Sequence, residues 1–394
     1  MSVSALRAPV ATQQPIPLFD LKRQQARLRH DIDRRLAKVL DHGQFILGPE
    51  VTELEESIAA FSGVAHGIGV SSGRDALIMA LMAMGVGPGD AVIVPAFTFS
   101  ATAAVVSSVG ATPVFVDVDP ATYNMDPHAI APAIESARTR GLDPKVVMPV
   151  DLFGLPADYA AIKQVTDAYG VRIVADAAQS FGGRIGDARV GGLAPISCVS
   201  FYPTKPLGAF GDGGGLLTDD DELAETVRQI RTHGRQGDGD EAMRIGMTGR
   251  LDTMQAAILL AKLSVFKAEL NRRAEIAALY NKLLDGVCTL PPADGVSRSA
   301  YALYTVRLKN RDGARDALAA RQIGAGLFYR VPLHKHPAFA ATLAGDEKLG
   351  VAEMLSREVL SLPMGPDITD DEVHMVADTL VEFVHGNAGQ PAAA

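Results

Sequence analysis

From about residue 65 onward, short apolar runs alternate with segments of helical pattern. The apolar runs have the length of strands and read AVIVPA, PVFVDVD, KVVMPVDLF, VRIVAD and SCVSFY. They are apolar on both faces, as strands are when helices cover both sides of a parallel sheet. Between them lie helical patterns such as DALIMALMAM and YAAIKQVTDAYG. This alternation predicts an α/β fold, with a mostly parallel sheet flanked by helices and right-handed crossovers.

The pattern changes after residue 250. LDTMQAAILLAKLSVFKAELNRRAEIAALYNKLL predicts one long helix or two in line. Beyond it, YALYTVRL and IGAGLFY are expected strands, and ARDALAARQ and the segment near 370–385 are expected helices. Apolar residues at every fourth position predict another helix near 22–41. The expected parts, with the long helix as a bridge, are a flexible tail over 1–15, a large α/β domain over 16–260 and a small C-terminal α+β domain over 261–394.

Net charge and apolar content exclude several classes of protein. The formal net charge is −9 and the isoelectric point about 5.5, which argues against nucleic acid as a partner. No apolar run approaches the ~20 residues of a membrane-spanning helix, and the N-terminal segment lacks the apolar core of a signal peptide. Cys198 and Cys288 are too few for a disulfide framework. We therefore expect a cytoplasmic protein with no nucleic-acid or membrane partner.

Chemically useful residues follow the ends of several expected strands, where open α/β sheets bind ligands. SSGRDAL (71–77) places backbone N–H groups at a helix start, where they can bind phosphate. Asp176 can hold a protonated ring nitrogen, Phe97 can stack on a flat ring, and Lys205 can form a Schiff base with an aldehyde. The glycines after Lys205 leave room for a cofactor. Together these features meet the requirements of pyridoxal 5'-phosphate.

Each feature also has a purely structural explanation. An Asp after a strand is often a turn residue, SSG is a common helix cap, and a buried aromatic residue is usually part of the core. The run GAFGDGGG lacks the strand–turn–helix context of a dinucleotide-binding fingerprint. His334-Lys335-His336 has no third ligand at a matching spacing, so no metal site is predicted. The joint occurrence of the features at successive strand ends favours the cofactor.

The same residues belong to a series of motifs that covers most of the chain. In this series the sequence resembles the DegT/DnrJ/StrS family of pyridoxal-phosphate-dependent nucleotide-sugar aminotransferases, which have the fold-type I, aspartate aminotransferase-like architecture. The matching blocks run in order from residue 43 to residue 339 and are GQFILGPEVTELE, SSGRDAL, PAFTFSATA, PVFVDVDPATYNMDP, ADAAQSFGG, SFYPTKPLGAFGDGG, RTHGR, GRLDTMQAAILLAKL and YRVPLHKHPAF.

The resemblance implies a role for individual residues. Lys205 matches the lysine that holds the cofactor covalently, and Asp176 matches the carboxylate at its ring nitrogen, so these two are the predicted catalytic residues. The further cofactor-binding residues that it implies are Gln179, Ser200, Gly73, Arg74, Phe97 and Thr248. The substrate-binding residues that it implies are Arg250, Tyr329, His334 and Phe45.

Some positions depart from the family's pattern. Arg74 replaces a threonine that contacts phosphate, and Thr248 replaces an asparagine that the partner subunit supplies. Phe328 replaces a histidine present in relatives that act on uronic-acid sugars, which argues against a glucuronate-type substrate. Lys205 itself is present, whereas related dehydratases have histidine there, so transamination is favoured.

The resemblance also implies the reaction and the assembly. The expected enzyme moves an amino group from an amino acid, with L-glutamate as the expected donor, to a keto nucleotide-diphosphate sugar. A 3-keto sugar is favoured over a 4-keto sugar, and the product would serve amino-sugar, lipopolysaccharide or glycoside biosynthesis. A homodimer with shared active sites is implied. Two alternatives stay open, a same-fold aminotransferase acting on a cyclitol ketone and a non-catalytic regulator that binds pyridoxal phosphate.

Overall fold

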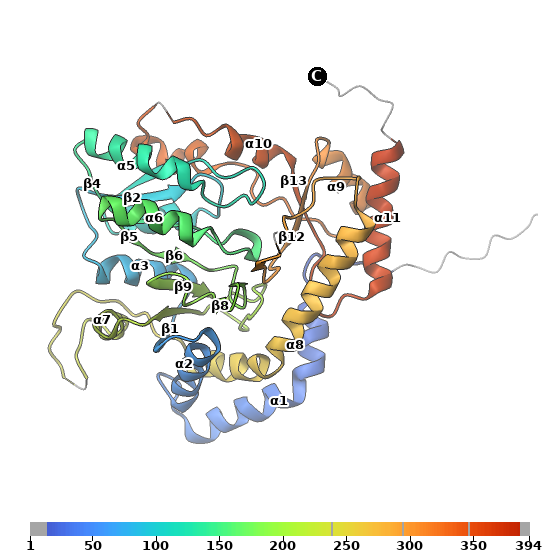
Figure 1. Cartoon of the computed structure of the whole chain (residues 1–394). Helices are drawn as coiled ribbons and strands as arrows, with labels where there is room; N and C mark the ends of the chain where they lie inside the picture. Colours follow the sequence, from blue (N-terminus) through green and yellow to red (C-terminus); the bar gives the residue numbers. More distant parts are fainter. Residues whose placement is uncertain (1–13, 238, 294, 346, 387–394) are drawn as a thin grey trace, which may run out of the picture.

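A central sheet organises the larger part of the molecule in the computed structural model, which describes residues 14–237, 239–293, 295–345 and 347–386 (Figure 1). β5 and β6 are successive parts of one extended segment, and a parallel bridge from Val150 to Asp176 joins the two halves of the sheet. The predicted tail falls mostly on residues 1–13, outside the described residues. Across the sheet the strands are β3 (Thr112–Val116), β2 (Asp90–Pro95), β4 (Asp143–Val147), β5 (Arg172–Ile173), β6 (Ala175–Asp176), β9 (Ile196–Ser200), β10 (Gly214–Thr218) and β1 (His66–Val70).

Of these strands, β10 runs opposite to the others, which confirms the predicted mostly parallel α/β sheet. Both faces are buried. On β2, Val92 and Val94 pack in one hydrophobic cluster, and the alternating residues Ala91 and Ile93 pack in another. The first cluster includes α3 (Gly73–Ala83), α4 (Ala101–Ser108) and α7 (Asp221–Arg231), and the second includes α5 (Ile130–Thr139) and α6 (Tyr159–Tyr169).

A smaller unit follows at the C-terminal end (Figure 1). Its strands β12 (Tyr304–Arg307) and β13 (Val359–Leu362) pair antiparallel, and α9 (Arg311–Ala320) and α11 (Asp370–Gly386) pack around them. The expected strand over IGAGLFY is not formed. In this segment Ile323 and Gly326 each make an isolated bridge instead. β12 pairs instead with β13, a four-residue strand too short to stand out in the sequence.

The helix α8 (Thr253–Leu283) is continuous and connects the two units, as predicted for one long helix. Its N-terminal half packs with α2 (Pro49–Ser62) through Ala256 and Leu259. Its C-terminal half contributes Ile276 and Tyr280 to the core of the smaller unit. The boundary at residue 260 stays a prediction. Chain outside 261–394 also joins the small core, because Ile16 packs there and bridges Ile323.

Two other segments cross between the units. The helix α10 (Gly350–Glu358) belongs to the C-terminal part of the sequence but packs in the core of the large sheet. A small three-stranded sheet lies beside α8 and consists of β11 (Ser297–Arg298), β7 (Arg184–Ile185) and β8 (Ala188–Arg189). Neither unit is therefore one continuous stretch of sequence, because Ile16 belongs to the core of the smaller unit and α10 to the core of the larger one.

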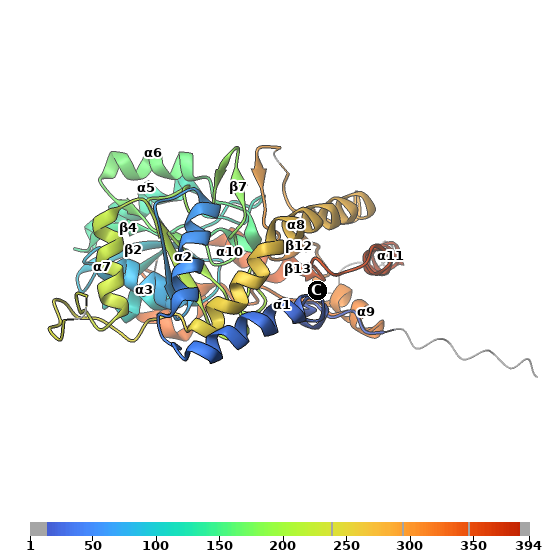
Figure 2. The same ribbon diagram turned by 90° about the horizontal axis from the view of Figure 1, so that it is seen from below.

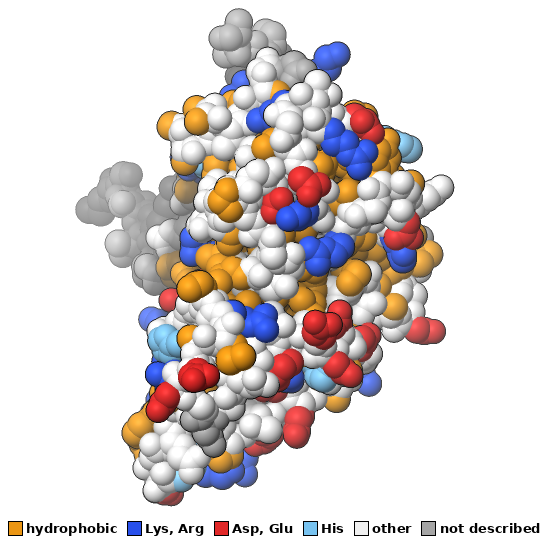
Figure 3. Space-filling model, turned by 90° about the vertical axis from the view of Figure 1, so that its left-hand side faces the viewer, with side chains coloured by type: hydrophobic (Ala, Val, Ile, Leu, Met, Phe, Trp, Pro, Cys, Tyr) orange, Lys and Arg blue, Asp and Glu red, His pale blue; other side chains and the backbone are white. Residues whose placement is uncertain are grey.

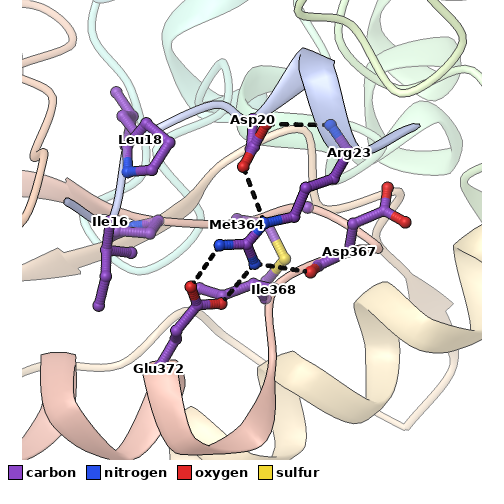
Figure 4. Close-up of a pocket in the computed structure, with 11 residues that line it drawn as sticks. Ile16, Leu18, Asp20, Arg23, Met364, Asp367, Ile368 and Glu372 are labelled. Atoms are coloured by element: carbon purple, nitrogen blue, oxygen red, sulfur yellow. Dashed lines mark hydrogen bonds and ion pairs between the residues drawn. The ribbon is translucent and has the colours of Figure 1, made fainter. Parts of the chain in front are cut away.

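The first helix, α1 (Leu21–His42), confirms the helix expected near 22–41 and lies along α8 (Figure 2). Ion pairs tie it to the C-terminal unit. The Arg23 guanidinium donates to both carboxylate oxygens of Glu372 on α11, at 2.7 and 2.6 Å (Figure 4). Arg27 pairs with Asp367 and with Glu269 on α8, whose carboxylate is buried.

Charged side chains of both signs are interspersed on the face of the molecule shown in Figure 3, and hydrophobic side chains lie between them. Among the described residues, none of the helices combines the length and the apolar character that a membrane crossing requires.

We expect the substitution Arg27→Met to lower the free energy of unfolding by about 2 kcal/mol, because it leaves the buried Glu269 carboxylate without its cationic partner. Arg29→Met is the matched control on the same helix. Arg29 is exposed and pairs with Asp33, so its loss is expected to change stability by about 0.5 kcal/mol or less. Urea-induced unfolding of the two variants measures the difference. Equal midpoints would contradict a stabilising role for the Arg27 pair.

Candidate functional site

A cavity of about 470 Å³ lies at the carboxyl ends of the parallel strands. Much of its lining follows these strands: Ser72 follows β1, Thr98 follows β2, Val150 follows β4, Asp176 ends β6 and Ser200 ends β9. Because parallel strands end at one edge of a sheet, residues far apart in sequence meet there. Of the residues predicted from the sequence, the cavity is lined by Gly73, Arg74, Asp176, Gln179, Ser200, Lys205 and Tyr329.

Lys205 brings an amine to this cavity. It lies in a tight turn in which its N–H donates to the carbonyl of Tyr202 at 2.8 Å. Burial lowers the pKa of the Lys205 amine to about 8, and the charge of Asp176 partly offsets that effect. An appreciable fraction of the amine is therefore neutral near neutral pH, which is the form that attacks a carbonyl carbon.

The Asp176 side chain interacts electrostatically with the Lys205 amine and is 5% exposed. Its Oδ2 accepts a hydrogen bond from the Thr102 hydroxyl at 2.7 Å, and its Oδ1 accepts one from the Ala178 N–H at 3.3 Å. Burial raises the pKa of Asp176, against the effect of these hydrogen bonds and of Lys205. A buried carboxylate is stabilised by a cationic partner, so a protonated ring nitrogen in the cavity would suit it.

Gln179 is fixed from two sides. Its Oε1 accepts from the N–H of Phe153 at 2.9 Å, and its Nε2 donates to the Tyr329 hydroxyl at 3.2 Å. Burial raises the pKa of Tyr329, so its hydroxyl stays protonated. The amide and the hydroxyl together present fixed hydrogen-bonding groups at the wall of the cavity.

Asp151 supports the turn that carries Asp176 and Gln179. Its N–H donates to the Asp176 carbonyl at 3.1 Å, and its carboxylate accepts from Ser180 at 2.6 Å and Tyr159 at 2.8 Å. Burial raises the pKa of Asp151 to about 6. Nothing local in the sequence marks Asp151 as important, because its partners come from later in the chain.

The N-terminus of α3 forms the anion-binding part of the cavity. Ser72 caps the helix by accepting from the N–H of Asp75, and the N–H groups of Gly73 and Arg74 precede the first intrahelical hydrogen bond. A Cβ at Gly73 would come within 2.6 Å of the Ser200 Cβ. A Cβ at Gly214 would collide with the backbone of Ser72 and Gly73. The glycines are therefore needed for this close packing, which suits a phosphate group.

The glycine-rich loop after Lys205 is held by two side chains of α8. Lys262 is buried, donates to the Gly208 carbonyl at 2.6 Å and lies 4.8 Å from the centre of the Phe210 ring. Gln255 accepts from the Phe210 N–H at 2.9 Å. Burial lowers the pKa of Lys262 to about 8. Neither residue was identified from the sequence, because an apolar helix gives no local sign of such a contact.

The structure corrects the aromatic residue of the cavity. Phe97 is 1% exposed and belongs to the hydrophobic core, so it does not present its ring to the cavity as predicted. Phe99, two residues later, is 57% exposed and lines the cavity with its ring centre 6.1 Å from that of Tyr329. β2 ends at Pro95, so the alternation of a strand does not decide which aromatic faces the ligand.

Two further predicted residues have other partners. His334 is 8% exposed and lies outside the cavity lining, with its Nε2 3.1 Å from Glu353 on α10. The predicted contact of His334 with substrate stays a prediction. Arg74 lines the cavity, but its guanidinium donates to Ser108 at 2.9 Å, so its backbone N–H is the group directed to an anion.

Thr248, Arg250 and Phe45 do not line the cavity of their own chain. The Thr248 hydroxyl is 3.4 Å from His233 Nε2. The backbone of Arg250 forms an isolated antiparallel β-bridge with that of Val70. Phe45 is half exposed in the loop between α1 and α2, and its carbonyl accepts from the N–H of Thr253. The assigned roles of these three residues stay predictions.

The residues present fit pyridoxal phosphate. Lys205 supplies an amine for its aldehyde, the buried Asp176 supplies a counter-charge for its ring nitrogen, and the start of α3 supplies N–H groups for its phosphate. Phe99 supplies an exposed aromatic face. The cavity therefore contains a basic side chain, Lys205, and an acidic one, Asp176. A purely apolar ligand would need neither.

Comparisons with known proteins agree with this fit. A model of the DegT/DnrJ/EryC1/StrS aminotransferase family matches residues 26–381. A UDP-2-acetamido-2-deoxy-3-oxo-D-glucuronate aminotransferase of Pseudomonas aeruginosa is 45% identical, over 93% of this chain and 99% of its own. A UDP-N-acetyl-3-dehydro-alpha-D-glucosamine 3-aminotransferase of Acidithiobacillus ferrooxidans is 41% identical over 94% and 98%. A Geobacillus stearothermophilus protein named pleiotropic regulatory protein is 40% identical over 93% and 98%.

Solved structures give the same result. The structure of S. venezuelae DesV with a ketimine intermediate has a TM-score of 0.90 and 38% identity, and the match covers 94% of this chain and 99% of that one. The structure of NtdA from Bacillus subtilis with bound cofactor PMP has a TM-score of 0.85 and 27% identity, over 97% of this chain and 87% of that one. These matches confirm the predicted fold.

We expect Lys262→Met to raise the dissociation constant for pyridoxal phosphate by about tenfold, because the Gly208 carbonyl in the loop after Lys205 loses a charged donor. Titration of the apoenzyme with cofactor, followed by absorbance, measures it. Lys282→Met, at an exposed position in the last turn of α8, is the control. If both variants bind the cofactor as the parent does, the loop is held without Lys262.

Proposed function

Because the chain belongs to the DegT/DnrJ/EryC1/StrS aminotransferase family, we propose that it transfers an amino group from an amino acid to the keto group of a nucleoside-diphosphate sugar. L-glutamate is the proposed donor. The observation that carries the proposal is the cavity in which the Lys205 amine and the buried Asp176 carboxylate lie beside the N-terminus of α3.

The reaction follows from what these residues do. When bound, pyridoxal phosphate accepts and returns the amino group. It also stabilises the negative charge that is left when a proton leaves the substrate carbon carrying that amino group. The neutral fraction of the Lys205 amine accepts that proton, and the resulting ammonium returns it at the next step. Asp176 stays charged beside a protonated ring nitrogen, because each charge stabilises the other in a buried site.

The remaining groups orient the cofactor. The N–H groups of Gly73 and Arg74, with the Ser200 hydroxyl, would bind its phosphate at the start of α3. The exposed Phe99 ring would stack on the cofactor ring, the role expected from the sequence for Phe97. The Gln179 amide donates to the Tyr329 hydroxyl, which holds both polar groups at the cavity wall.

The visible absorption spectrum of the purified protein tests the first half-reaction. We expect a yellow protein whose visible band decreases on addition of L-glutamate. Lys205→Ala is expected to bind the cofactor without a covalent bond and to lose at least about a hundredfold in turnover, the usual contribution of a positioned general base. A yellow protein that does not respond to amino donors would instead support a regulatory role, which the name of the Geobacillus relative raises.

The proposed acceptor is a sugar with the keto group at C3. The names of two relatives, one for a 3-oxo-glucuronate and one for a 3-dehydro-glucosamine, support this choice. Comparing kcat/KM for these two UDP sugars also tests the expectation from Phe328 that a glucuronate is not preferred. A free cyclitol ketone as the better acceptor would contradict the nucleotide-sugar proposal.

We further propose that two copies of the chain form a homodimer and complete each other's site. Arg250, Thr248 and Phe45, all outside the cavity of their own chain, would then act in the cavity of the partner. Large hydrophobic side chains are exposed near the end of α1 and in the loop that follows it, and they are Leu40, Phe45, Ile46 and Leu47. Such a patch is unusual on a monomer surface and suits an interface between copies.

Mixing two inactive variants tests the shared site. If Arg250 acts in the partner, Lys205→Ala mixed with Arg250→Ala gives heterodimers with one intact site, and about one quarter of the parental activity is expected to return. If Arg250 acts in its own chain, neither site of the heterodimer is intact and no activity returns. An affinity tag on one of the two variants verifies exchange, because the untagged variant is then captured with it.

A further inference from the structure

A second cavity, of about 310 Å³, lies between the small sheet β11-β7-β8 and the middle of α8. It shares no lining residue with the cavity of Lys205. One wall is formed by Phe61 at the end of α2, and another by Lys267 and Leu270 on α8. None of the groups used for transamination lies in it.

The cavity collects positive charge in a chain whose formal net charge is −9. Four cationic side chains line it from four different elements: Arg184 from β7, Arg189 from β8, Lys267 from α8 and Arg298 from β11. The lining contains one carboxylate, Asp187, which is fully exposed to solvent and 3.9 Å from Arg184. A fully exposed carboxylate at this distance compensates little of the charge.

Neutral partners hold these cations in place. Arg189 donates to the Phe61 carbonyl at 2.6 Å and lies 4.5 Å from the centre of the Phe61 ring. Arg298 donates to the Asn271 side-chain oxygen at 2.8 Å, and Arg184 donates to the Gly186 carbonyl at 3.0 Å. These partners orient the guanidinium groups without neutralising them, and each group keeps further N–H donors.

Lys267 differs from the arginines. Among the described residues its ammonium has no hydrogen-bond or ion-pair partner, and its side chain is exposed beside the cavity. The substitution of Lys267 therefore removes a charge without removing a structural contact. This makes it the most informative position for a binding experiment.

We propose that this cavity binds a small, multiply charged oxyanion of the phosphate type. The convergence of four cations is unfavourable by itself, and a bound anion of two or more charges removes that repulsion. Guanidinium groups pair with the oxygens of phosphates in a bidentate manner, which favours a phosphate-type ligand over a single carboxylate. The site lies apart from the transamination cavity and is additional to the proposed function.

Titration calorimetry of the cofactor-loaded enzyme with inorganic pyrophosphate tests the proposal. We expect saturable binding that weakens as sodium chloride is added. Lys267→Ala and the double variant Lys267→Ala/Arg298→Ala are each expected to weaken binding by at least about tenfold, because each removes a charged donor. Lys163→Ala/Arg315→Ala removes the same charge from helices elsewhere and is expected to bind as the parent does.

A second titration with uridine diphosphate separates two sources of the anion. If the double variant loses a tight uridine diphosphate site that the parent has, the ligand is the diphosphate of a nucleotide. If pyrophosphate binds more tightly than uridine diphosphate, the ligand is the free anion. Circular dichroism confirms that the variants are folded. The proposal is overturned if the parent enzyme shows no saturable binding of pyrophosphate, or if Lys267→Ala binds it unchanged.

Discussion

The buried carboxylate of Asp176 sets the condition that the rest of the site meets. A charge 5% exposed to solvent needs donors and a cation close by, and the fold provides Thr102 from α4, a backbone N–H in its own turn and Lys205 from the loop after β9. These groups come from segments far apart in sequence. Only the parallel sheet, which ends several strands at one edge, brings them to a single point.

The support of the site extends into a second layer of side chains. Asp151 fixes the turn below Asp176 and Gln179 through Ser180 and the backbone. Lys262 fixes the loop on the other side through Gly208. Both side chains are buried and hydrogen-bonded to the segments that they support, so they act on the position of the reacting groups without lining the cavity.

The sheet and the positions of Lys205 and Asp176 could be predicted, because strand periodicity is a local property of the sequence and the strands of a parallel sheet end at one edge. The choice between Phe97 and Phe99 could not be made, since both follow the end of β2, where strand alternation no longer applies. The partner of His334 could not be predicted for a different reason. Its ring is paired with Glu353 on α10, a contact that depends on how a distant helix packs.

The helix α8 contacts both the catalytic loop and the smaller unit. Lys262 near its start grips the loop of Lys205, and Tyr280 near its end is embedded in the other core. The helix is bent between these two contacts (Figure 1), although it is continuous from Thr253 to Leu283. Because one helix is anchored in both places, a change in the relative orientation of the two units has to deform either this bend or the contact with the loop of Lys205.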